Sequence, residues 1–268
     1  YNTLDNYIDT LSCALQTPYA NYEAIGVKNE TGYQQLSSSL LQIENEFYSA
    51  IRPKRVAQSG ETPLKALKER GIEYIEVRCL DINPFLATGI DAETIEFLDA
   101  FLLHCLLDDS PQCDQEEFHL ISQNQARIVH HGRDPNVHVF CGKNEVPMRD
   151  CANNILNSIE KISAQLDAAH QTNRYSQSIA VQREKVADAS LTPAAKVLAS
   201  MKENNESHID FSLRMSQSHA VQHKSHDVEA QQQQNLLTIA EQSVTSQKEI
   251  EQQDSIHFDE FLAHYFEQ

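Results

Sequence analysis

The stretch that decides the fold is GIEYIEVRCLDINPF, residues 71–85. Its centre alternates between polar and apolar side chains, and successive side chains of a β-strand point to opposite faces of the sheet. One face consists of Ile75, Val77 and Cys79, and the other of Tyr74, Glu76 and Arg78. We therefore predict a strand over residues 72–80 whose apolar face packs on the core and whose other face carries two opposite charges.

The charged face of this strand has two interpretations. Glu76 and Arg78 stand two positions apart, which places them about 7 Å from each other along the strand. They could form the solvent-facing side of a half-exposed antiparallel sheet. They could instead form the floor of an active site, where a carboxylate binds a hard cation and a guanidinium binds phosphate.

A second strand is predicted over residues 40–51, within the stretch LLQIENEFYSAIRPKR, residues 40–55. One parity holds Gln42, Glu44, Glu46, Tyr48 and Arg52, and the other holds Ile43, Phe47 and Ile51. The segment ends in Arg52-Pro53-Lys54-Arg55, a basic run in an acidic chain. This run indicates either a solubilising turn or an anion site for phosphates or carboxylates.

Charge and composition exclude several classes of function. The 268 residues carry a net charge of −18, which argues against nucleic-acid binding and against docking on an anionic membrane surface. No run of 18 apolar residues predicts a transmembrane helix. The six cysteines lack CxxC spacing, and we interpret them as reduced thiols of a cytoplasmic protein. Because the sequence does not begin with Met, we expect a fragment of a longer protein.

The chain is predicted to change from mixed α and β structure to helix after Gly142. Residues 143–268 contain no glycine, and tight β-hairpins usually need one. An apolar stripe at helical spacing runs through residues 148–169, and Thr192-Pro193 is typical of a helix start. Other helices are predicted over residues 4–15, 63–71, 95–106 and 194–201, and an apolar helix over 256–265 that can pack back on the chain.

Three regions follow from these patterns. They are a partial catalytic region over 1–142, a helical region packing on it over 143–204, and a polar Gln/His-rich tail over 205–268, helical or partly disordered. In the tail, His219, His223 and His226 would share one face of a helix, but their polar neighbours favour no metal site. The chain has no GxxxxGK[ST] loop and no GxGxxG, so an ATP enzyme of this sequence would hold phosphates through metals and basic side chains.

The two motifs at 40–55 and 71–85, in this order and separation, resemble the proteobacterial glutamate–cysteine ligase family. The resemblance continues more weakly through the first helices, the apolar helix at 93–107 and LTPAAKVLASM at 191–201. It implies an α+β fold with part of a curved, mainly antiparallel sheet similar to that of glutamine synthetase. It also implies that the chain is the C-terminal part of such an enzyme, without the N-terminal strands that supply several metal ligands.

The resemblance further implies an activity and its residues. ATP would phosphorylate the γ-carboxylate of glutamate, and the amine of cysteine would attack the acyl phosphate to give γ-glutamylcysteine, the first step of glutathione synthesis. Glu76 matches a Mg²⁺ ligand, Arg78 matches the residue that steadies the transferred phosphoryl group, and Tyr48 matches a tyrosine that lines the cysteine pocket. Glutamate, cysteine and ATP would be the small-molecule partners.

Two other interpretations remain open at this point. One is a related carboxylate–amine ligase with a different amine acceptor, because only the family resemblance of Tyr48 favours cysteine. The other is a helical interaction protein that keeps an inactive ligase half as a scaffold, against which the intact YIEVR stretch argues. For the ligase interpretation, we expect the fragment alone to be inactive, because it offers too few carboxylates for a hard cation.

Overall fold

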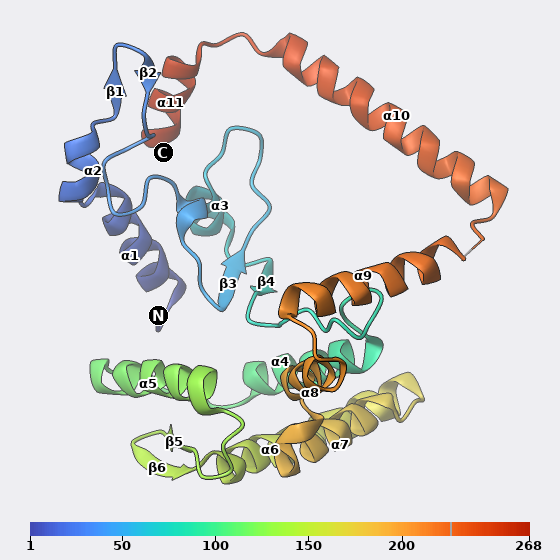
Figure 1. The fold of residues 1–268 in the computed structure, drawn as a ribbon. Helices are drawn as coiled ribbons and strands as arrows, with labels where there is room; N and C mark the ends of the chain where they lie inside the picture. Colours follow the sequence, from blue (N-terminus) through green and yellow to red (C-terminus); the bar gives the residue numbers. More distant parts are fainter. Residues whose placement is uncertain (226) are drawn as a thin grey trace. The chain divides into compact units, whose positions relative to one another are not determined.

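The computed structural model describes residues 1–225 and 227–268, which form two compact units (Figure 1). Unit 1 consists of residues 1–81 and 228–268, and unit 2 of residues 82–227. The boundaries of these units differ from the boundaries of the three regions expected from the sequence. Residue 81 falls inside the expected first region, and the end of the tail belongs with the N-terminal residues.

Unit 1 combines helices with small antiparallel ladders. Its elements are α1 (Leu4–Gln16), α2 (Ala20–Ile25), β1 (Lys28–Asn29), β2 (Gly32–Tyr33), the 3₁₀ helix η1 (Glu44–Glu46), β3 (Ile51–Lys54), α3 (Pro63–Arg70), β4 (Tyr74–Val77), α10 (Ala230–Gln253) and α11 (Phe258–Phe266). The hydroxyls of Thr3 and Thr62 cap α1 and α3, and α3 ends at Gly71 in a positive-φ conformation that suits glycine. The core between α1 and α3 is formed by Tyr7, Ile8, Leu11, Leu64 and Leu67.

Strands β3 and β4 pair antiparallel, with Arg52 opposite Glu76 and Lys54 opposite Tyr74. Strand β4 confirms the middle of the strand predicted over residues 72–80. The backbone amide of Arg78 donates to the carbonyl of Ala50 at 2.8 Å, which extends the pairing by one residue. The apolar face is less buried than predicted, because Ile75 is 45% exposed and no described residue covers it fully.

The predicted strand over residues 40–51 is wrong. Its residues form a loop that contains η1, and β3 begins only at Ile51. Glu44 is only 4% exposed, and its carboxylate accepts a hydrogen bond at 2.7 Å from the hydroxyl of Tyr265. Alternation of polar and apolar residues predicts a strand with Glu44 on a charged face. The structure instead buries Glu44 against a partner 221 positions away in the sequence, which a local pattern does not indicate.

Helix α11 packs against the beginning of the chain, as its apolar pattern allowed. The carboxylate of Asp259 receives the Lys28 ammonium at 3.0 Å and the Tyr33 hydroxyl at 2.5 Å. Phe258 meets the ring of Tyr33 edge to face, with 5.2 Å between centroids. Leu262 of the same helix is buried. The last helix is thus part of unit 1 and fixes the loop that holds Glu44.

Unit 2 is mostly helical. Its elements are α4 (Ala92–Leu107), α5 (Gln115–His131), β5 (His138–Cys141), β6 (Asn144–Pro147), α6 (Met148–His170), α7 (Arg174–Ala187), η2 (Ala189–Leu191), α8 (Pro193–Asn204) and α9 (His208–Lys224). Helices α4, α6 and α7 pack around Ala100, Leu156, Ile159 and Ile179. The carboxylate of Asp167 on α6 caps α7 by accepting hydrogen bonds from the backbone amides of Tyr175 and Ser176, at 3.0 and 2.9 Å. The helix predicted from the apolar stripe over 148–169 is confirmed, but its buried face is formed by Leu156, Ile159, Ser163 and Asp167, so of the predicted stripe only Ile159 is fully buried.

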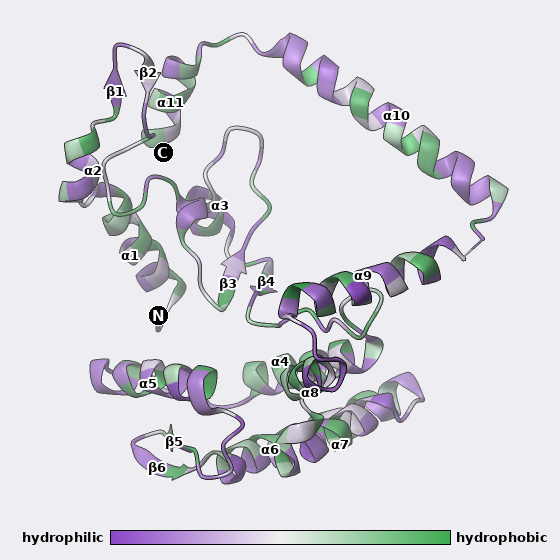
Figure 2. Cartoon of the chain, in the orientation of Figure 1, coloured by the Kyte–Doolittle hydropathy of each residue, from purple (hydrophilic) through white to green (hydrophobic). Residues whose placement is uncertain are grey.

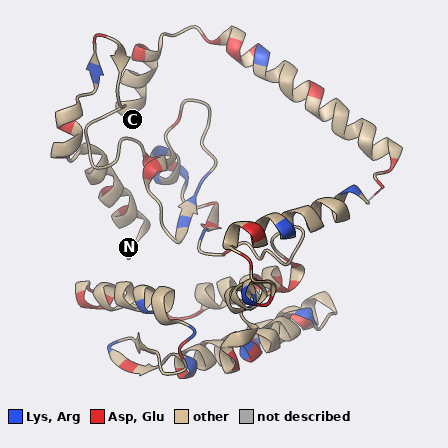
Figure 3. Cartoon of the chain, viewed as in Figure 1, with Lys and Arg blue, Asp and Glu red and all other residues tan. Residues whose placement is uncertain are grey.

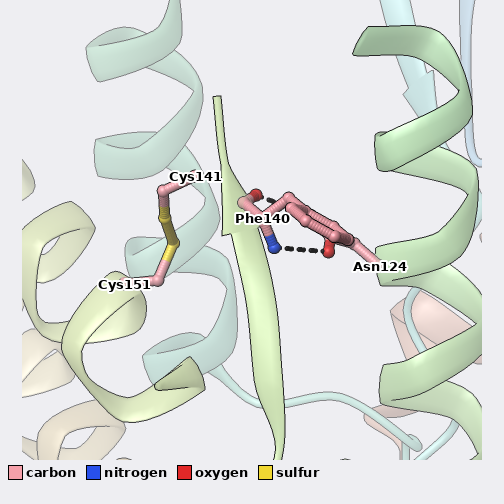
Figure 4. Close-up of a disulfide and its surroundings, with 4 residues drawn as sticks. All are labelled: Asn124, Phe140, Cys141 and Cys151. Carbon is pink, nitrogen blue, oxygen red and sulfur yellow. Dashed lines mark hydrogen bonds between the residues drawn. A yellow bond between two sulfur atoms is a disulfide. The ribbon is translucent and has the colours of Figure 1, made fainter. Parts of the chain in front are cut away.

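A hairpin of β5 and β6, which the sequence did not predict, precedes α6. Gly142 turns it at a φ of +57°. Figure 4 shows Asn124 of α5 exchanging two hydrogen bonds of 2.7 Å with the backbone of Phe140. Cys141 and Cys151 form a disulfide in this structure, so the expectation that all cysteines are reduced is wrong for this pair. The hairpin brings their Cα atoms to 6.5 Å, a proximity that a separation of ten residues does not reveal.

The tail is helical in the part that the structure describes. Every residue of α10 is exposed, and Figure 2 shows it as largely hydrophilic. His226 of the predicted histidine face lies outside the described residues. The ring Nε2 atoms of His219 and His223 lie 2.8 and 3.1 Å from the carbonyls of Pro84 and Ala87, so both side chains have backbone partners within unit 2. None of the described helices is long and apolar enough to cross a membrane.

Two isoleucines of α6 test the core of unit 2. Ile159 is fully buried, whereas Ile155, one turn earlier, is 42% exposed. We expect Ile159→Ala to lower the free energy of unfolding by about 2–5 kcal/mol, through lost burial and the cavity left behind. Ile155→Ala is the matched control and should cost clearly less. Urea titrations of both variants measure the difference, and equal losses would show that the core does not lie where the structure places it.

Candidate active site

Both strands of the β3–β4 ladder carry charged residues (Figure 3). The Oε1 atom of Glu76 lies 3.0 Å from Nε of Arg78, and its Oε2 atom lies 3.5 Å from Nζ of Lys54. Arg78 is two residues along the same strand, and Lys54 is on the neighbouring strand. A single carboxylate therefore lies between two cations, each contributed by a different strand of the ladder.

The protonation of Glu76 follows from these neighbours. Burial raises the pKa of the Glu76 carboxyl, but the hydrogen bond and charge of Arg78 and the charge of Lys54 outweigh it and hold this pKa below its usual range. A lowered pKa means that the ionised pair stabilises the fold at neutral pH, and that this contribution is lost as pH falls through the pKa of Glu76. Glu76 is therefore an anion at neutral pH.

Tyr48 lies beside the same group of charges. The guanidinium carbon of Arg78 is 5.0 Å from the centroid of the Tyr48 ring, a distance typical of cation–π contacts. The ring itself is 76% exposed. The structure thus brings together the three residues selected from the sequence, Tyr48, Glu76 and Arg78, although Tyr48 comes from a loop and not from the predicted strand.

The basic run at 52–55 does not form an open anion site. Arg52 is 5% exposed, and its Nη2 atom donates to the carbonyl oxygen of Glu44 at 3.4 Å. Arg55 lies 3.7 Å from a carboxylate oxygen of Glu73, and Lys54 pairs with Glu76. Sequence reasoning did not single out Lys54 by itself. The signal that identifies it is the register of the ladder, which a single sequence does not supply.

The other acidic residues of the first motif lie away from the ladder face. Glu44 is buried against Tyr265, and burial together with this hydrogen bond raises the pKa of the Tyr265 hydroxyl well above its usual range. Glu46 accepts a hydrogen bond from the backbone amide of Gln42 at 2.7 Å. These two glutamates hold the loop together, and the expectation that they share a face with Tyr48 is wrong.

A magnesium ion prefers several oxygen ligands, and this ladder offers one carboxylate. The Oε2 atom of Glu76 is buried, and its partner in the described structure is the Lys54 ammonium at 3.5 Å, so a metal ion bound there would share this oxygen with Lys54 or displace the ammonium. Among the described residues, no group of three His, Cys, Asp or Glu side chains could hold a metal ion. Glu76 is thus a single carboxylate, and among the described residues no further carboxylate, histidine or cysteine joins it in a cluster of three.

Comparison with known proteins identifies relatives of this chain. The model of the glutamate–cysteine ligase family matches residues 1–128. The chain is 44% identical to the glutamate–cysteine ligases of Pseudomonas fluorescens and Pseudomonas aeruginosa, over 99% of this chain and 50% of each of those proteins. The crystal structure of the Francisella tularensis glutamate–cysteine ligase in complex with AMP matches 100% of this chain and 53% of its own, with a TM-score of 0.91 and 32% identity.

A more distant structure shares the fold alone. The bifunctional glutathione synthetase of Pasteurella multocida matches 82% of this chain with a TM-score of 0.54 and 19% identity. The resemblance found in the sequence is confirmed, and the chain is related to the glutamate–cysteine ligase family along almost its whole length. The chain spans about half the length of the curated relatives it matches.

The pairing of Glu76 with Arg78 can be measured directly. We expect Arg78→Gln to raise the pKa of the Glu76 carboxyl. In this variant Glu76 loses the guanidinium that donates a hydrogen bond to it and that is its closest positive charge. Arg55→Gln is the matched control, since Arg55 pairs with Glu73. Carbon-detected NMR titration of the Glu76 side chain follows both variants. An unchanged pKa in Arg78→Gln would contradict the pairing.

Proposed function

We propose that this chain contributes part of the active site of an ATP-dependent ligase that joins the γ-carboxylate of glutamate to the amine of cysteine. The observation that carries the proposal is the cluster of Glu76, Arg78, Lys54 and Tyr48 on the β3–β4 ladder, in a chain related to glutamate–cysteine ligases. The AMP complex of the Francisella relative supports the nucleotide. A reaction that consumes ATP fits the cytoplasm.

The reaction needs activation because a carboxylate is a poor acylating agent. In the first step, an oxygen of the γ-carboxylate attacks the γ-phosphorus of ATP, and ADP leaves. In the second, the amine of cysteine attacks the acyl carbon, phosphate leaves, and the nitrogen loses a proton. Phosphoryl transfer depends mostly on positioning and on neutralising charge. The ladder supplies a negative charge at Glu76 for a cation and a positive charge at Arg78 for the phosphate oxygens.

Arg78 is the residue we assign to the transferred phosphoryl group. Its guanidinium is planar and permanently charged, and its several N–H donors match phosphate oxygens. Its contacts with Glu76 and Tyr48 hold it near the open side of the ladder. A donor that is positioned before the reaction stabilises charge at little cost of reorganisation.

Glu76 and Tyr48 complete the assignment. Glu76 would provide one oxygen to Mg²⁺, and the bound ion would neutralise phosphate charge. Arg78 and, to a smaller extent, Lys54 hold the pKa of the Glu76 carboxyl below its usual range. The exposed ring of Tyr48, held beside Arg78, is available to line the site of the amine substrate, for which we propose cysteine.

Two substitutions in the complete enzyme separate these roles. Glu76→Gln keeps size but removes the charge, so we expect ligation to fall on the order of 10²-fold and the Mg²⁺ requirement to rise. Arg78→Lys keeps charge but loses the planar fork, so we expect a loss of similar size, mainly in kcat. Steady-state assays at varied Mg²⁺ measure both. Normal activity of Glu76→Gln at low Mg²⁺, or an Arg78→Lys effect confined to the KM for cysteine, would contradict the assignments.

The chain of residues 1–268, expressed alone, should have no ligase activity. The described residues provide one carboxylate on a two-stranded ladder, and a hard cation needs more oxygens. The assay is ADP release that depends on both glutamate and cysteine. Recovery on addition of a separately expressed N-terminal half of a related ligase would support the proposal. Robust turnover by this chain alone would show that its own residues form a complete site.

A further inference from the structure

Unit 2 contains a cavity that the proposed ligase site does not use. It has a volume of about 400 Å³ and lies among α4, α6, α7, η2 and the segment that follows α5. Its lining residues all fall within 97–192, so none of them belongs to the β3–β4 ladder. The volume is in the range of pockets that bind small organic molecules.

The wall of the cavity is apolar. Phe97 and Phe101 of α4 are stacked, with ring centroids 6.0 Å apart and an angle of 16° between the planes. Both rings pack against the buried core of unit 2, which includes Leu156 of α6. Val186 of α7 also lines the space. Such a surface binds a flat or chain-like apolar body by excluding water from it.

Three cations line the same cavity, each from a different segment. They are Arg133 after α5, Arg149 in the first turn of α6, and Lys185 in α7. The ion pairs described in unit 2 use other cations, namely Arg127, Lys143, Arg174, Arg183 and Arg214. Among the described residues, these three lining cations therefore remain outside salt bridges, in a chain with a net charge of −18.

Nearby carboxylates only partly offset these charges. Asp134 lines the cavity, but its carboxylate accepts a hydrogen bond from the backbone amide of Asn136 at 2.9 Å. Asp188, which interacts with Arg149, and Asp91, which interacts with Lys185, are engaged as backbone caps of η2 and α4. The lining itself has three positive side chains and one negative one, so it favours an anion.

We propose that this cavity is a binding site for a small organic anion with an apolar body, such as an aryl- or alkyl-carboxylate. The apolar part lies against Phe97 and Phe101, and the carboxylate lies towards Arg133, Arg149 and Lys185. A hydrogen-bonded pair with a charged donor is stronger than a neutral one, so the charged end gives the site its selectivity. The site is independent of ligase chemistry, because it shares no residue with the ladder.

The test compares two probes that differ in charge. Calorimetry on the full chain measures binding of 4-phenylbutyrate and of its neutral amide, 4-phenylbutanamide. We expect one site for the acid and at least tenfold weaker binding of the amide. Arg149→Gln should weaken the acid about tenfold and leave the amide unchanged. Lys161→Gln, an exposed cation elsewhere on α6, is the matched control and should change neither.

A second set of variants fills the cavity. Ala152→Phe and Ala189→Phe each place a ring into the lining from a different element, and either should abolish binding of both probes. Thermal unfolding shows which of the two variants is folded, and a folded one is used. The proposal is overturned if the unsubstituted chain does not bind the acid, if the amide binds as tightly, or if a folded cavity-filling variant binds the acid normally.

Discussion

The site depends on one carboxylate that lies between two cations. Glu76 contacts Arg78 along its own strand and Lys54 across the ladder, so the pairing of β3 with β4 fixes all three charges at once. Tyr48 then packs its ring against Arg78. The loop that contains η1 precedes β3. That loop is held by Glu44, which is bonded to Tyr265 of the last helix. The last helix thus contacts the loop that leads into β3.

The helices could be predicted from the sequence because their signals are local. Thr62-Pro63 and Thr192-Pro193 begin helices as their side chains predict, and the apolar spacing over 148–169 correctly predicts a helix, although its buried face includes Leu156 and Asp167, which lie outside the predicted stripe. The hairpin at β5 and β6 escaped prediction, because one glycine, Gly142, is enough to turn it. The disulfide between Cys141 and Cys151 was not predicted either, because the tertiary structure, and not the local sequence, brings the two cysteines together.

The candidate site was predictable in part. Alternation alone placed Glu76 and Arg78 on one face, and the structure agrees. The same reasoning failed at Glu44 and Arg52, because it assumes that charged residues face solvent. Both are buried: Glu44 has its partner in Tyr265 of the last helix, and Arg52 donates to the backbone carbonyl of Glu44, in the segment that was predicted as a strand and forms a loop. Lys54 could be found only from the strand register. The assignments of metal, phosphoryl and amine sites came from family resemblance, because a single face of two strands is compatible with several chemistries.

The central claim is that Glu76 and Arg78 act together in catalysis and do not merely hold the ladder. A double-mutant cycle in the complete ligase tests it most directly, with Glu76→Gln, Arg78→Gln and the double variant measured for both kcat/KM and unfolding free energy. The account predicts strongly non-additive losses of kcat/KM, with each unfolding free energy changed by less than about 1 kcal/mol, as for a partly exposed ion pair. Losses of activity that merely follow the fraction of unfolded protein would contradict it.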